Sequence, residues 1–286
     1  MSAVLIVAGF ALRESLRRRV FLVVGVLTAG FLGLFTLGTW QAFRTLGSEA
    51  GSLSIAGVDT ATVTAATLLG LAMFATLFLG TILAVFLTLG AVRGDAERGL
   101  LQPIVVRPVA RRDVLLGRFA AAAGVCALYV IGVFLIAAAI TWAFGGWWPD
   151  RTLVPAIALA LSMAVLCALS LAGSVLLSST ANGIAVFMVF GAGLTGGLLG
   201  QIAEVIGSHT LAGVASWTSW ALPFEALYQA ALSDLTADTV GFTRLALDLG
   251  PFGGAQSAGP LLWPWTAAYL LGVGAIAARA FARRDL

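Results

Sequence analysis

Residues 93–118 read RGDAERGLLQPIVVRPVARRDVLLGR and determine how the rest of the chain is interpreted. They join two apolar runs, 60–92 and 114–144, each longer than the roughly 20 residues that a helix needs to cross a bilayer. Arginines and acids are dense here in a chain with only 10% charged residues, so the segment must lie in water. Because an arginine excess between two spans marks the cytoplasmic side of a membrane, the sequence predicts a cytoplasmic loop at 93–113.

The composition is that of an integral membrane protein. Of the 286 residues 60% are hydrophobic, and the mean hydropathy is +1.03. All 16 basic residues are arginine; a P-loop needs lysine to reach the nucleotide phosphates, so the chain is not expected to hydrolyse ATP by that route. The arginines cluster at membrane boundaries instead of forming a soluble patch, which argues against nucleic acid as a partner. The two cysteines and single histidine have no metal-ligand spacing, so no metal site is predicted.

The apolar runs predict an all-α, polytopic protein that forms a single transmembrane domain over residues 1–286. Six runs are long enough to span a membrane: 20–40, 60–92, 114–144, 153–177, 183–206 and 261–281. Of the 16 arginines only Arg44, Arg151 and Arg244 would lie outside, which predicts a cell-membrane protein with both termini in the cytoplasm.

The first 19 residues are predicted to form an interfacial elbow helix. Residues 3–12 are apolar but too short to span, and a cluster of basic residues follows them. This pattern is typical of a helix that lies in the cytoplasmic interface with its basic end towards anionic headgroups. A first half-span without a special role is the alternative.

The fifth run contains closely spaced glycines, Gly193, Gly196, Gly197 and Gly200. Pairs four residues apart allow another helix to approach closely, so either an internal helix contact or a homodimer seam would use them. The largest outer segment follows at 207–260, and an amphipathic pattern from Pro223 predicts short helices that re-enter the outer leaflet. For 238–257 a partly ordered loop resting on the membrane is an equally open reading.

A motif within the charged loop points to a family. Asp95-Ala96-Glu97-Arg98-Gly99-Leu100-Leu101-Gln102 is followed by Arg107-Pro108-Val109-Ala110-Arg111 and then by Leu115-Leu116-Gly117-Arg118. This order resembles the first cytoplasmic loop of ABC-2 type exporter permeases, which typically shows an acidic and basic cluster, Gly-Thr-Leu, Pro-Val-Ser-Arg and Leu-Leu-Gly-Lys. The chain departs from the pattern at Leu100, Ala110 and Arg118 and by an added Pro103. It is most similar to permeases of nitrous-oxide-reductase maturation and of multidrug or antibiotic export.

The resemblance implies that the loop carries a short coupling helix docked on a separate cassette ATPase. Two ATPase copies would hold the ATP and magnesium, and the permease would pair with a second copy or a paralogue; no cofactor is expected in this chain. The residues implied in coupling are Asp95, Glu97, Arg98, Gly99, Leu100, Leu101, Arg107 and Arg111. Their chemistry suits a contact, because an arginine fork can bind carboxylates and exposed leucines need cover. On physical grounds alone, a solvated loop that only sets topology is the alternative. The inner turn at 178–182 is a second, weaker candidate for ATPase contact.

The predicted function is the permease subunit of an ATP-driven exporter for an amphipathic or lipid-like substrate or drug. No acid, histidine or arginine lies in the middle of a predicted span. Ion-coupled carriers place ionisable groups at that depth, so an ion-coupled secondary transporter is disfavoured, as is an intramembrane protease or metalloenzyme. A membrane scaffold or assembly factor that transports nothing is the remaining alternative, and it would have no ATPase partner.

Overall fold

The structure is a computed structural model that describes residues 6–9, 20–49, 59–89, 111–240, 243 and 259–283. Nearly all of these residues are helical, and the described part contains no strand. The main helices are α2 (Val20–Glu49), α3 (Thr60–Thr88), α6 (Arg111–Gly145), α7 (Leu153–Leu176), α8 (Ser179–Ile206), α9 (His209–Ala221), α10 (Pro223–Asp234) and α12 (Leu262–Ala282).

Six of these helices, α2, α3, α6, α7, α8 and α12, are long and apolar enough to cross a membrane. The predicted fold class, an all-α protein with six membrane-spanning helices, is therefore confirmed. The first helix is longer than expected: the predicted span ended at residue 40, whereas α2 continues to Glu49. Of the predicted elbow helix only residues 6–9 are described, and they are helical; the rest of 1–19 lies outside the described residues.

Local sequence sets several of the helix ends. Asp59 caps α3, because its side chain accepts hydrogen bonds from the backbone nitrogens of Ala61 and Thr62 at 3.1 and 3.3 Å. Ser178 caps α8 in the same way, accepting from the nitrogen of Ala181 at 3.5 Å. The other end of α8 is closed by Gly207, whose φ of 65° is a left-handed conformation that glycine adopts without a steric penalty. These ends fix where α8 turns back into α9.

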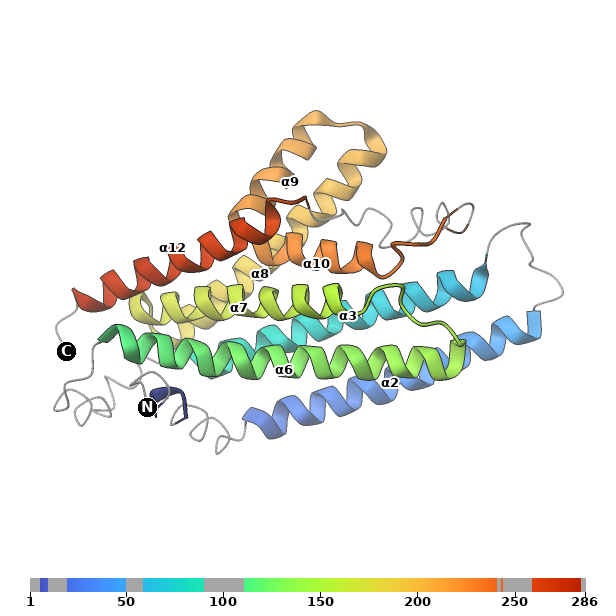
Figure 1. Ribbon diagram of the computed structural model, residues 1–286, viewed down its shortest axis with the longest axis horizontal. Coiled ribbons are helices and arrows are strands. Elements are labelled where there is room, and N and C mark those ends of the chain that lie inside the picture. The colour runs from blue at the N-terminus through green and yellow to red at the C-terminus, as the bar shows by residue number, and fades with distance from the viewer. Residues whose placement is uncertain are drawn as a thin grey trace.

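The helices form a bundle with α7 at its centre (Figure 1). α7 packs against α3, α6, α8, α10 and α12, whereas the main contacts of α2 are with α3 and α6. α3 and α7 are the most buried spans and α2 is the least buried. In Figure 1 the second half of α8 and most of α9 stand out from the bundle, while α10 lies alongside α7. A broad apolar surface is left on α2, α8 and α12, as expected where lipid replaces water.

Candidate functional site

Most residues of the predicted coupling site lie outside the described residues. These are Asp95, Glu97, Arg98, Gly99, Leu100, Leu101 and Arg107, and Arg111 is described only as the first residue of α6. The structure does place both ends of the loop, because α3 ends at Thr88 and α6 begins at Arg111. The coupling role of the eight residues therefore stays a prediction.

A buried polar bridge joins three helices at the end of the bundle where that loop attaches. The hydroxyl oxygens of Thr88, the last residue of α3, and Ser170 of α7 are 2.5 Å apart. The Thr88 hydroxyl also donates to the carbonyl of Ala84 at 2.7 Å, so Ser170 is the donor between the two hydroxyls. Asn182, in the first turn of α8, donates from Nδ2 to the Ser170 carbonyl at 2.9 Å. The end of α3 is thus hydrogen-bonded through α7 to the start of α8.

The close approach at Asn182 depends on a glycine in α7. A Cβ at Gly173 would overlap the Asn182 side chain, so a larger residue does not fit unless the Asn182 amide is displaced. Asn182 is 1% exposed, and its buried Oδ1 has no hydrogen-bond partner among the described residues. In the inner turn that was a second candidate for ATPase contact, Ser178 is exposed while Asn182 points into the bundle. Asn182 therefore belongs to the internal packing of this turn.

The four closely spaced glycines of α8 lie under α9 and α10 of the same chain. A Cβ at each would meet a side chain of one of those helices. In the order Gly193, Gly196, Gly197 and Gly200, the nearest side chains are those of Phe224, Thr218, Glu225 and Ala215. The sequence left open an internal contact or a homodimer seam; in this chain the glycines provide the surface on which α9 and α10 pack.

Glu225 is the residue whose placement was least expected from the sequence. It lies in the first turn of α10 and is 2% exposed. Its Oε1 accepts a hydrogen bond from Gln229 Nε2 at 2.8 Å. Burial raises the pKa of Glu225 to about 7, and the Gln229 hydrogen bond opposes part of that rise. The sequence shows an acid in an outer segment, and only the packing of α10 against α7 and α8 reveals that it is buried.

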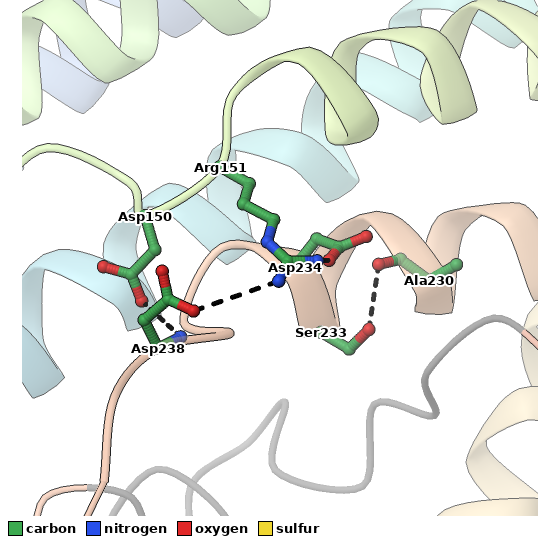
Figure 2. A network of polar contacts seen from close by, with 6 residues as sticks. All are labelled: Asp150, Arg151, Ala230, Ser233, Asp234 and Asp238. Carbon is green, nitrogen blue, oxygen red and sulfur yellow. Dashed lines mark hydrogen bonds and ion pairs between the residues drawn. The ribbon is translucent and has the colours of Figure 1, made fainter.

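Figure 2 shows how the turn between α6 and α7 holds the other end of α10. Arg151 donates from Nη1 to Asp234 Oδ1 at 3.1 Å, and its Nη2 lies 3.9 Å from Asp238 Oδ1. Asp150 Oδ2 accepts from the backbone nitrogen of Asp238 at 3.0 Å, and the Asp150 nitrogen donates to the Leu235 carbonyl at 3.1 Å. At its first turn α10 is held by Ser162, whose hydroxyl donates to the Phe224 carbonyl at 3.0 Å. Both ends of α10 are thus fixed to the bundle.

The polar contacts described above lie within the helix bundle. Among the described residues, no group of three histidines, cysteines or acids could hold a metal ion. The polar groups join helices to one another at the two ends of the bundle. The loop that joins α3 to α6 attaches directly to the first of these connections.

Comparison with known proteins agrees with this architecture. No curated protein matches the sequence. A family model described as ABC-2 family transporter protein matches residues 5–286, which is nearly the whole chain. The chain therefore belongs to the ABC-2 family of transporter proteins.

Proposed function

We propose that this chain is the permease subunit of an ATP-driven exporter that moves an amphipathic or lipid-like compound, or a drug, out of the cell. Its family consists of membrane components of ABC transporters, and membership implies an ATPase subunit as partner. ATP and magnesium would be bound by that partner. Two ATPases would serve a dimer of this chain, or this chain with a paralogue.

The polar bridge of Thr88, Ser170 and Asn182 is the observation that supports coupling best. Nucleotide-driven movement of an ATPase would push the loop at 93–113, which begins just after α3 ends. Because α3 is hydrogen-bonded through α7 to α8 at this end, such a push would be passed to three spans together. Hydrogen bonds between buried hydroxyls and amides connect membrane helices without exposing charge to lipid. The switch would be a rigid-body motion of these spans.

The arrangement of charges and tryptophans supports a cytoplasmic location for the loop. Figure 1 shows the starts of α2 and α6 and the end of α12 at one end of the bundle. Arg112 and Arg279 belong to that end, and an arginine excess favours the cytoplasmic side. Trp220 lies in the last turn of α9, and Trp265 lies in the first turn of α12, at the end of that helix away from Arg279. Their rings pack edge to face at 5.2 Å, as in an interfacial aromatic belt. We therefore place both termini in the cytoplasm and the protein in the cell membrane.

Co-purification from native membranes tests the ATPase partnership. Tagged protein is compared with the double variant Glu97→Ala/Arg98→Ala, and cassette ATPases are identified by mass spectrometry. Arg44→Ala is the matched control, because it removes a charge from the opposite side of the membrane. We expect an ATPase with the unaltered protein and with Arg44→Ala, and less of it with the double variant.

The outcomes separate the competing functions. If no ATPase co-purifies with the unaltered protein in mild detergent, the exporter proposal fails and a non-transporting scaffold or assembly factor takes its place. If an ATPase co-purifies equally with all variants, the docking site is elsewhere. Direction and substrate class would follow from uptake of fluorescent lipids and cationic drugs into inside-out vesicles, with an ATPase-inactive complex as control. An ion-coupled carrier would show uptake driven by an ion gradient without ATP.

A further inference from the structure

Among the described residues, Glu225 is buried without a cation to neutralise it. Of the helices packed against α10, α7 has no charged residue and α8 has only Glu204, about two turns beyond Gly197. His209 begins α9 at the end away from α10. On α12 the titratable groups are Tyr269, in the first half of the helix, and Arg279, in its last turn. Within α10 they are Tyr228, which interacts electrostatically with Glu225, and Asp234 at the last turn.

An ionised carboxylate in this position would be costly. Glu225 is 2% exposed, and the described residues offer it a single donor, the amide nitrogen of Gln229. Burying a charge with neither a partner charge nor a full set of hydrogen bonds is strongly unfavourable, and the group usually becomes neutral instead. The described surroundings therefore suit a protonated carboxylic acid.

The hydrogen bonding of Gln229 also fits a protonated acid. Its Nε2 donates to Glu225, but its Oε1 is buried and has no partner among the described residues. A protonated Glu225 gains one O–H donor. The unpartnered Oε1 of Gln229 is an acceptor on the same amide whose nitrogen already donates to Glu225. Protonation would thus supply the donor that this amide lacks, whereas an ionised Glu225 leaves the amide oxygen unsatisfied.

Gly197 provides the space that the acid and amide occupy. A Cβ at Gly197 would overlap Glu225 Oε1 and lie 3.0 Å from Gln229 Nε2, so both groups rest against the bare backbone of α8. The bare backbone at Gly193 likewise leaves space for the ring of the neighbouring Phe224. The contact of α10 with α8 therefore depends on a carboxyl that remains in this space.

We propose that Glu225 is a proton-binding site that controls how α10 packs on α8. The neutral acid stays against Gly197 with the Gln229 amide, and loss of the proton forces the carboxylate to take up water or leave, which loosens α10. Because α10 is also held by α7 and by the turn between α6 and α7, loosening it changes the outer end of the bundle. The proposal concerns this chain alone and does not depend on an ATPase or a substrate.

The pH dependence of stability has a definite sign. The folded-state pKa of Glu225 is about 7, above its ordinary value of 4.5, so the folded protein holds a proton that the unfolded chain releases. The resulting stability is complete below about pH 4.5 and is lost as the pH rises through about 7. Glu225→Gln keeps the shape and has an amide donor, but it cannot titrate. The variant should therefore lack the part of the pH dependence of stability that Glu225 causes in this window.

Infrared difference spectroscopy tests the proposal directly. The full-length protein in lipid nanodiscs is titrated from pH 5 to pH 9, and the absorption of protonated carboxyl groups is followed. We expect an absorption that disappears with a midpoint near 7 in the unaltered protein and is absent in Glu225→Gln. A matched pair of glycine variants extends the test: Gly197→Ala should displace the acid into water and lower the midpoint, whereas Gly191→Ala, with open space at its Cβ, should not.

Two results would overturn the proposal. One is an unaltered protein whose carboxyl absorption is the same as that of Glu225→Gln at every pH. The other is a midpoint that is identical in Gly197→Ala and Gly191→Ala, because it would show that the space at Gly197 does not hold the acid neutral. If Glu225→Gln fails to fold, the pair of glycine variants decides alone, since both retain Glu225.

Discussion

Replacing Gly193 with alanine tests whether α10 packs on the glycines of α8. Phe224 is fully buried, and its ring stacks on that of Phe190 with centroids 5.8 Å apart and an angle of 16°. A Cβ at residue 193 would overlap the tip of the Phe224 ring and approach its Cε1 and Cε2 atoms to 3.0 and 3.2 Å. The ring is rigid and Phe190 covers it, so the backbones of α8 and α10 must separate to admit the methyl group.

The expected magnitude follows from a comparison with Gly191 on the same helix. Overpacking of a well-filled core costs about 1–3 kcal/mol. Alanine is also a better helix former than glycine by about 0.5–1 kcal/mol, which applies to both positions. None of the described residues comes within 4 Å of a Cβ at Gly191, so Gly191→Ala should be neutral or slightly stabilising. The difference between the two variants therefore isolates the overpacking cost at Gly193.

The assay is equilibrium unfolding of the purified chain in mixed detergent micelles, followed by circular dichroism. We expect Gly193→Ala to unfold at a lower denaturing-detergent fraction than Gly191→Ala, with a difference of about 1–3 kcal/mol in the free energy of unfolding. Equal stability of the two variants would refute the reasoning, because it would mean that Phe224 does not lie against Gly193.

Three further predictions concern the helix connections. Asn182→Ala should lower the free energy of unfolding by about 1–2 kcal/mol, since it removes the donor to the Ser170 carbonyl; chemical denaturation checks this. Asp59→Ala should cost about 0.5–2 kcal/mol through loss of the α3 cap. Hydrogen bonds from Thr62 lower the pKa of Asp59 below its ordinary 3.8. The stabilisation by the ionised cap is therefore complete above that pH and is lost as the pH falls further. A pH series of melting curves should show this loss in the unaltered protein and not in Asp59→Asn. Arg151→Ala should cost no more than about 1 kcal/mol, and less at high salt, because its pair with Asp234 is partly exposed; melting at two ionic strengths measures this.

The six spans could be predicted because the length of an apolar run is a property of the sequence alone. The end of α2 was predicted less accurately. The apolar run ended at residue 40, but a helix can continue past the apolar region, and α2 does so to Glu49.

The partners of the glycines and the burial of Glu225 could not be predicted for a different physical reason. Close glycine spacing indicates that something approaches α8, but not that α9 and α10 are what approach. Glu225 belongs to an outer segment by hydropathy, and its burial arises from contacts with helices distant in sequence. The residues of the 93–113 loop carry the family resemblance, and their role in coupling stays a prediction.

The central position of α7 has a consequence for how this chain tolerates change in length. Adding one residue to a helix rotates everything beyond it by about 100°. In the middle of α7 such an insertion would turn its second half away from several of the five helices that pack on it, and separate Ser170 from both Thr88 and Asn182. In α2, whose main contacts are with two helices, the same insertion disturbs much less. Engineered tags and sensor domains should therefore be tolerated near α2 and rejected within α7.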